Sequence, residues 1–296
     1  MKILVLGAGG FIGAQVSQGL SQNHDVARAD IAPDAGDLRF PANPRAADIS
    51  ALIARTIPEV IINCTGAASV PASMDAPARD FALNVDVVLQ CLDAIRDTRR
   101  PIRFVHLSSA AVYGNPTSLP VREDSPVVPV SPYGMHKNIA EMLCRQYARF
   151  FDVPTISLRI FSAYGPGLRK QLFWDVHQKV LRGGPLQLFG TGDETRDYLY
   201  VADVVSAIAV VLDRGVFDGR AINLGSGRET STRDAVSCLL RKLGVKRELV
   251  FSNEVRQGDP LHWRADISSL AALGFTPTFD MDAGLEVTAA WLSAQT

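Results

Sequence analysis

The sequence has no excess of charge of one sign and no long hydrophobic run. Its 296 residues contain 30 lysines and arginines against 31 aspartates and glutamates. A chain this balanced has no strong field to attract nucleic acid or an anionic membrane, so we expect neither as a partner. No run reaches the roughly 18 apolar residues that a spanning helix needs. Glycine breaks the N-terminal apolar run too early for a signal peptide, so we expect a cytoplasmic protein.

Cysteine and histidine are sparse, and neither has the spacing of a structural site. The four cysteines, Cys64, Cys91, Cys144 and Cys238, are scattered without a paired motif. This argues against a disulfide framework and against a zinc site. The five histidines show no ligand spacing either. We therefore expect reduced thiols and no bound metal.

Short apolar runs alternate with longer amphipathic segments over the first half of the chain. The apolar runs predict strands at 2–7, 25–30, 59–66, 102–109 and 154–161. The amphipathic segments predict helices at 11–23, 78–98 and 131–151. Strands that alternate with helices of this length form a parallel sheet covered on both faces. The predicted fold class is α/β, with a doubly wound Rossmann sheet.

The pattern of the sequence changes after about residue 165, where glycine and proline become frequent. A further helix is predicted at 200–214 and a strand with a turn at 221–227. We divide the chain into a larger domain, 1–165, and a smaller mixed lobe, 166–296, with segments of the lobe returning to the sheet.

The segment GAGGFIG, residues 7–13, lies between the first predicted strand and the first predicted helix. Gly7 permits the tight turn, Gly10 lets a pyrophosphate approach the backbone, and Gly13 allows close helix–strand packing. The free N–H groups and dipole of the helix N-terminus favour phosphate. Asp30 ends the next strand, where a carboxylate binds ribose hydroxyls and repels a 2′-phosphate. This pattern predicts NAD rather than NADP, although Arg28 is close enough in sequence to accommodate the phosphate if the strand is regular.

The segment SPYGMHK places Tyr133 and Lys137 one helical turn apart. A lysine ammonium at that distance stabilises a phenolate and lowers the pKa of the tyrosine, so that it exchanges a proton with a substrate hydroxyl. The segment LSSAAVYG offers Ser108 and Ser109 at the end of a predicted strand, and Ser109 is the candidate to hold the reacting oxygen. Alone, the tyrosine and lysine would be better explained as an exposed surface pair. Together with the glycine turn they point to one crevice beyond the carboxyl ends of the strands.

These motifs together resemble an extended short-chain dehydrogenase/reductase of the NAD-dependent epimerase/dehydratase family, which includes UDP-galactose 4-epimerase. The resemblance runs nearly end to end and rests on the motifs GAGGFIG, Asp30, SSAAVYG, PYGMHK, RDYLYVADV (196–204) and RQGD (256–259). It implies that 1–165 is an NAD-binding domain and that 166–296 binds a nucleotide sugar. It also implies a homodimer through the helices at 78–98 and 131–151. The apolar stripe VVLQCLDAI is available for that contact but is equally typical of core packing.

The resemblance assigns roles to matched positions. The implied catalytic residues are Ser109, Tyr133 and Lys137. The implied cofactor contacts are Gly7, Gly10, Phe11, Ile12, Gly13, Asp30, Asp48, Ile49, Cys64, Thr65, Gly66, Asn84, Ser108, Tyr133, Lys137, Ile160 and Phe161. The implied substrate contacts are Ser73, Ser109, Ser162, Arg196, Tyr198, Arg256 and Asp259.

Two of these sets have a more specific assignment. Asp48 and Ile49 match the pair that contacts adenine. Arg196 and Arg256 match the arginines that hold the diphosphate, a task that suits the planar guanidinium. The competing interpretation of these arginines is ion pairing with Asp197 and Asp259.

Departures from the family pattern narrow the predicted reaction. Dehydratases of the family carry Asp-Glu where this chain has Ala110 and Ala111, and alanine cannot act as an acid or base. Ser162 replaces an asparagine found in many relatives, and Ala68 replaces a lysine found in some 4-epimerases. We expect a nucleotide-sugar epimerase acting at C4 through a transient 4-keto sugar. The alternatives are a nucleotide-4-keto-sugar reductase that uses NAD(P)H and a binding protein that senses NAD(H).

Overall fold

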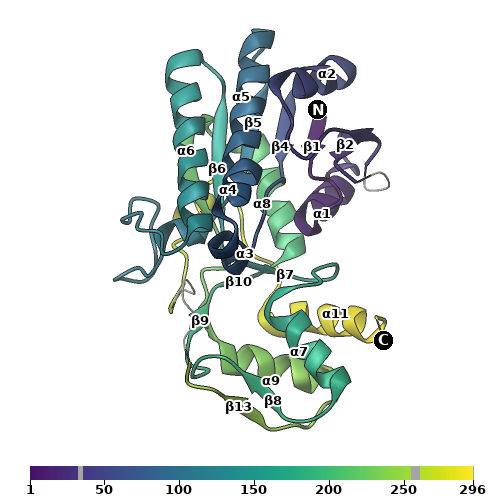
Figure 1. Cartoon of the computed structure of the whole chain (residues 1–296), viewed down its shortest axis with the longest axis vertical. Coiled ribbons are helices and arrows are strands. Elements are labelled where there is room, and N and C mark those ends of the chain that lie inside the picture. The colour runs from purple at the N-terminus through teal and green to yellow at the C-terminus, as the bar shows by residue number, and fades with distance from the viewer. Residues whose placement is uncertain (33–35, 255–260, 296) are drawn as a thin grey trace.

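A parallel β-sheet forms the centre of the larger lobe (Figure 1). The computed structural model describes residues 1–32, 36–254 and 261–295, and within these ranges seven strands form this sheet. All neighbouring strands in it are parallel. Their spatial order is β11 (Asp218–Leu224), β6 (Thr155–Ile160), β5 (Arg103–Ser109), β4 (Val60–Asn63), β1 (Lys2–Leu6), β2 (Asp25–Asp30), β3 (Leu38–Arg39). The order reverses between β1 and β4, so this is a doubly wound sheet, as predicted.

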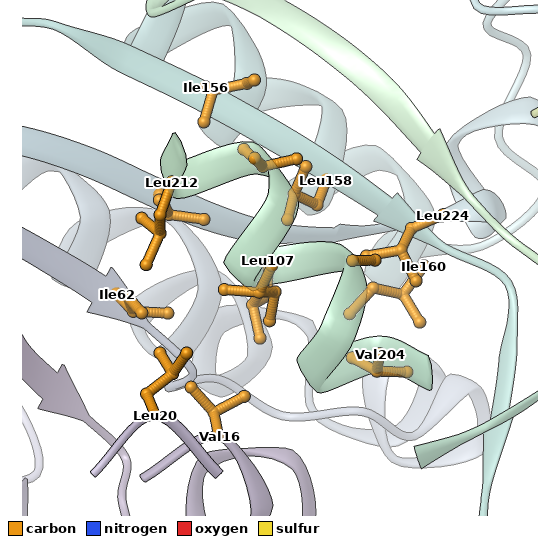
Figure 2. Packing of buried hydrophobic residues seen from close by; sticks show 14 of the residues in the cluster. Val16, Leu20, Ile62, Leu107, Ile156, Leu158, Ile160, Val204, Leu212 and Leu224 are labelled. Carbon is orange, nitrogen blue, oxygen red and sulfur yellow. The ribbon is translucent and has the colours of Figure 1, made fainter. Parts of the chain in front are cut away.

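Helices cover both faces of the sheet. On one face α1 (Phe11–Leu20) and α8 (Val201–Arg214) pack against alternate strand residues, and Figure 2 shows Leu107, Leu158 and Val204 meeting there. On the other face lie α2 (Ala46–Thr56), α5 (Val87–Thr98) and α6 (Pro132–Phe151). The strands are apolar on both sides because neither face meets water. The stripe on α5 is core, since Val88, Cys91, Leu92 and Ile95 are all buried among these elements.

The smaller lobe lies below the sheet in Figure 1. It packs α7 (Gln171–Arg182), α9 (Thr232–Lys242) and α11 (Met281–Ser293) with β8 (Leu186–Leu188) and β13 (Leu249–Phe251). Helix α8 and strand β11 come from this half of the sequence and return to the large sheet. None of the helices in the described ranges combines the length and the apolar character needed to cross a membrane.

Short elements join the two lobes. Strand β7 (Ser162–Tyr164) pairs with β10 (Tyr198–Tyr200), and β9 (Thr195–Arg196) pairs with β12 (Thr230–Ser231). Four short elements follow the carboxyl ends of two central strands. After β4 come α3 (Val70–Asp75), α4 (Pro77–Phe81) and a π-helical turn at Ala82–Asp86, and after β5 comes a 3₁₀ turn at Ala110–Tyr113. Helix α10 (Ser268–Ala272) packs near β11.

The structure differs from the sequence prediction at several elements, and the helices α2, α7, α9, α10 and α11 were not predicted. The helix predicted at 78–98 is divided into α4, the π turn and α5. The turn widens where the Asn84 amide donates to the carbonyl oxygen of Asp80 at 3.2 Å. The strand predicted at 59–66 ends at Asn63, and the two-residue strand β3 was not predicted. A strand this short gives no periodic signal.

Candidate active site

The glycine turn between β1 and α1 has the shape of a phosphate cradle. Gly7 has φ +78°, and a Cβ there would lie 2.9 Å from the backbone of Cys64. A Cβ at Gly13 would lie 2.0 Å from the carbonyl oxygen of Gly7. Gly10 caps α1 without a side-chain hydrogen bond, so the first N–H groups of the helix are left for an anion. Phe11 and Ile12, in the first turn of α1, are half-buried. These residues fit the pyrophosphate of a dinucleotide.

Asp30 lies beside this turn, at the carboxyl end of β2. Its carboxylate accepts hydrogen bonds from the backbone N–H of Gly9 at 2.7 Å and of Ala32 at 3.0 Å. A carboxylate oxygen can accept more than one hydrogen bond, so ribose hydroxyls can still bind. Arg28 is half-buried on the same strand.

The predicted adenine contacts, Asp48 and Ile49, lie on α2. Ile49 is fully buried in the core between α2 and the sheet. The carboxylate of Asp48 accepts the backbone N–H of Arg45 at 2.8 Å, which caps α2. The segment that lies beside Asp30 is β3, because Asp30 pairs with Arg39 and Ala29 pairs with Leu38.

The three predicted catalytic residues come together where β5 ends and α6 begins. Ser131 caps α6 by accepting the N–H of Gly134 at 3.2 Å, and Pro132 occupies the first turn. The hydroxyl of Tyr133 hydrogen-bonds the side chain of Ser109. Lys137 is buried and donates through Nζ to the carbonyl oxygen of Leu107 at 3.0 Å.

The ionisation of this group differs from the sequence prediction. Burial raises the pKa of Tyr133 above its usual value, although the hydrogen bond from Ser109 opposes the shift and the charge of Asp80 adds to it. The prediction that Lys137 lowers this pKa is therefore wrong for this structure. The reason is geometric, because Nζ lies 5.9 Å from the Tyr133 ring centre and is bonded to Leu107. Burial lowers the pKa of Lys137 to about 8, against an opposing effect of Asp80.

The loop after β4 and the π turn lie next to Lys137. A Cβ at Gly66, whose φ is +117°, would lie 2.4 Å from Asn84 Oδ1 and 3.4 Å from Lys137 Nζ. Asn84 Oδ1 is buried and, among the described residues, accepts no hydrogen bond. Thr65 donates to Asn63 Oδ1 at 2.5 Å. Burial raises the pKa of Cys64 to about 12, so it stays a thiol. Within the described ranges, Asn84 Oδ1 is thus an acceptor without a donor, and Gly66 has no side chain to fill the space beside it. Both features suit a cofactor that lies along this loop.

Two predicted contacts have structural roles instead. Ser73 is fully buried, donates to the carbonyl of Val70 at 2.7 Å and accepts the N–H of Tyr133 at 3.1 Å, so it holds α6 rather than substrate. The hydroxyl of Ser108 donates to buried Glu141 at 2.5 Å. Successive strand residues point to opposite faces, so Ser108 turns away from the side that Ser109 occupies. Both hydroxyls are thus engaged within the fold, and their predicted contact with a ligand stays a prediction.

An apolar wall follows Ser109. Ala110 and Ala111 are buried and pack in one cluster with Phe161 and Trp263. The Phe161 and Trp263 rings meet edge to face with centres 5.9 Å apart. Ile160 ends β6 and is buried against α8.

The predicted substrate residues lie where the lobes meet. Ser162 and Tyr198 are direct partners in the β7–β10 pair, and burial raises the pKa of Tyr198 to about 12. The Arg196 guanidinium lies 5.7 Å from the Trp263 ring centre. Asp197 is fully buried and accepts hydrogen bonds from Ser226, Gly227 and Ala265, so its carboxylate is committed to the fold. The predicted contacts Arg256 and Asp259 lie outside the described residues.

Sequence reasoning missed a set of buried charges around α6. Glu141 and Arg159 form an ion pair at 2.7 Å, and His136 Nδ1 lies 2.7 Å from Asp80 Oδ2. The available signal was helical spacing, since Glu141 follows Lys137 by one turn. Their partners come from distant parts of the chain, which spacing alone does not reveal.

The comparisons with known proteins agree with this geometry. Residues 3–225 match the sequence model of the NAD dependent epimerase/dehydratase family. The chain is 31% identical to a protein of Bacillus subtilis (strain 168) described as an uncharacterized UDP-glucose epimerase, YtcB, over 99% of this chain and 98% of that protein. It is 30% identical to a dTDP-glucose 4,6-dehydratase of Xanthomonas campestris pv. campestris (strain B100), over 97% of this chain and 92% of that protein.

A solved structure has the same architecture over its whole length. It is the UDP-glucuronic acid 4-epimerase from Bacillus cereus, in complex with UDP-glucuronic acid and NAD. The TM-score is 0.89 at 29% sequence identity, and the alignment covers 100% of both chains.

Proposed function

The chain belongs to the NAD dependent epimerase/dehydratase family, and from this membership we propose that it is a nucleotide-sugar epimerase acting at C4. It is an enzyme of that family. The single observation that carries the choice of reaction is the group formed by Ser109, Tyr133 and Lys137 next to an alanine pair. The site therefore contains residues that can transfer a proton, and its alanine pair lacks the acid and base that elimination of water needs.

Bound NAD supplies a hydride acceptor and donor at this site. Tyr133 takes the proton of the C4 hydroxyl, while Ser109, its hydrogen-bond partner, holds the same oxygen. Loss of that proton and of the C4 hydride leaves a 4-keto sugar. After the keto sugar has turned over in the site, Tyr133 would return the proton to the same oxygen. Lys137 is held next to Tyr133 by its hydrogen bond to the carbonyl oxygen of Leu107, so its ammonium lies within the site.

Ala110 and Ala111 argue against 4,6-dehydration. They are buried at the start of the 3₁₀ turn that follows Ser109 and present only methyl groups. Eliminating water needs an acid and a base beside the sugar, and side chains without ionisable groups provide neither. This distinguishes the chain from its dehydratase relatives by chemistry, although the identities to both kinds of relative are similar.

The proposed cofactor is NAD rather than NADP. Asp30 is held beside the glycine turn by Gly9, so a 2′-phosphate would meet a fixed negative charge. Because adenine is attached to that ribose, we propose that it binds at the start of β3, beside Asp37 and Leu38, rather than beside Asp48 and Ile49. Thermal shift with NAD and with NADP measures this preference.

We also propose a homodimer built on α6. Met142 and Phe150 lie on this helix and leave 56% and 67% of their surface exposed, which is unusual for large apolar side chains. A double substitution of Met142 and Phe150 by glutamate is expected to give a monomer in light scattering. An unchanged mass would remove α6 as the interface.

The experiment that tests the function is an incubation of purified protein with UDP-hexoses, with and without added NAD. An epimerase interconverts a C4 pair without consuming cofactor. Activity that needs stoichiometric NAD(P)H and a keto sugar would replace this proposal with a reductase. Binding of NAD and NADH without any turnover would favour a sensor.

A further inference from the structure

A second pair of ionisable groups lies buried at the catalytic helix. His136 is between Tyr133 and Lys137 in the sequence of α6, and Asp80 is on α4. His136 Nδ1 lies 2.7 Å from Asp80 Oδ2, and the pair is only 9% and 3% exposed. Phe81 covers the imidazole edge to face at 5.3 Å.

Asp80 is only partly satisfied by this contact. Its second oxygen, Oδ1, is buried and, in the part of the chain that the structure describes, has no hydrogen-bond partner. A buried carboxylate with one free oxygen is costly unless a donor keeps it charged. The ring N–H of His136 is that donor.

The charge of Asp80 acts on both proton-transfer residues. It favours the ammonium form of Lys137 and opposes the phenolate form of Tyr133, so it raises the pKa of each. This follows from Coulomb interaction at short range in a site with little water.

The other ionisable groups around Lys137 are neutral or paired. Burial raises the pKa of Cys64, from the loop after β4, and of Cys144, on α6, so both stay thiols. Burial holds the pKa of His106, on β5, well below its usual value, which keeps it uncharged. Glu141, also on α6, is paired with Arg159 of β6. Among the described carboxylates that act on Lys137, Asp80 therefore differs from Glu141 in having a histidine rather than an arginine as its partner.

We propose that Asp80 and His136 are positioning residues for the reaction, with His136 fixing the Asp80 carboxylate in place so that its charge acts on Lys137 and Tyr133. This rests on the proposed proton transfer at Tyr133. It assigns the pair a role in the pH range of the reaction, in addition to joining α4 to α6. Such a pair limits how readily Tyr133 ionises and extends the range over which Lys137 stays charged.

The test compares Asp80→Asn with wild type, because asparagine keeps the shape and removes the charge. Both limbs of the pH profile of kcat/KM are expected to move to lower pH by about one unit, the size of effect that a close charge has. Asp86→Asn removes the same charge from an exposed position on the adjoining π turn and is expected to leave the profile unchanged. Superimposable profiles for Asp80→Asn and wild type, with only the melting temperature lowered, would overturn the proposal.

Two changes at position 136 test the donor without removing Asp80. His136→Asn keeps an N–H close to the Nδ1 position and is expected to preserve the profile. His136→Ala removes this contact, so the Asp80 carboxylate loses its fixed position and the profile is expected to shift in the same direction as in Asp80→Asn. Equal shifts in these two variants would contradict the role of His136. These two variants at position 136 also test the proposal if Asp80→Asn does not fold.

A titration that needs no turnover separates this proposal from the proposed function. The near-ultraviolet absorbance of phenolate, taken as the difference between each protein and its Tyr133→Phe counterpart, isolates the ionisation of Tyr133. Its midpoint is expected to fall in Asp80→Asn and not in Asp86→Asn. An unchanged midpoint would refute the pair's electrostatic role, whatever substrate the enzyme converts.

Discussion

The buried ion pair between Glu141 and Arg159 allows a quantitative test of what holds α6 in place. Arg159 is 3% exposed and donates to Glu141 at 2.7 Å, to the Tyr113 hydroxyl at 2.7 Å and to the carbonyl of Glu123 at 3.0 Å. Arg159→Met leaves Glu141 buried without its cation. Breaking such a pair costs about 3–5 kcal/mol, a large share of the 5–15 kcal/mol that is typical of a folded domain.

A second variant separates the cost of an unpaired charge from the value of the pair. Replacing both partners with apolar residues, as in Glu141→Leu with Arg159→Met, removes the uncompensated charge and is expected to recover most of the loss. About 1–2 kcal/mol remains, because the hydroxyls of Ser108 and Tyr113 each lose a partner. Tyr113 keeps its bond to Asn223 Oδ1 at 2.7 Å, which limits that remainder.

The assay is urea unfolding followed by tryptophan fluorescence, with free energies from linear extrapolation. Arg220→Met is the control, since Arg220 pairs with Asp218 at 2.6 Å on the surface, and such pairs contribute about 1 kcal/mol or less. The reasoning would be refuted if Arg159→Met cost no more than this control. It would also fail if the double variant were less stable than the single one.

Three further predictions concern the site directly. Tyr133→Phe is expected to lower kcat by about 10²–10⁴-fold, the usual contribution of a general acid–base, with an unchanged melting temperature; full activity would exclude this proton transfer. The pKa of Lys137 is about 8, so its ammonium is lost as the pH rises through that value and this loss should lower kcat/KM; a Lys137→Met variant with an unchanged profile above pH 8 would contradict this assignment. Gly13→Ala should abolish the thermal shift caused by NAD, because the new Cβ would lie 2.0 Å from the Gly7 oxygen, whereas Gly10→Ala, at 3.3 Å, should only weaken it.

Local patterns were enough to predict the Rossmann sheet and the position of its cofactor turn. Apolar strands, helical periodicity and glycine spacing act within about a dozen residues, and each is readable along the chain. The grouping of Ser109, Tyr133 and Lys137 also followed, because parallel strands all end at the same edge of a sheet. Burial was not readable in the same way: Ile49 and Ser73 had a suitable residue type and order for ligand contact, and the structure places both inside the fold.

The sequence by itself determined the fold class, the family and the residues available for proton transfer. Tertiary structure decided which of those residues face the crevice and how they ionise. Ser108 and Ser109 are neighbours, yet one meets Glu141 inside the fold and the other meets Tyr133. The pKa of Tyr133 rises rather than falls because burial and the charge of Asp80, more than fifty positions away in the chain, outweigh the hydrogen bond from Ser109. Desolvation and Coulomb energies depend on three-dimensional distance, which residue spacing does not contain.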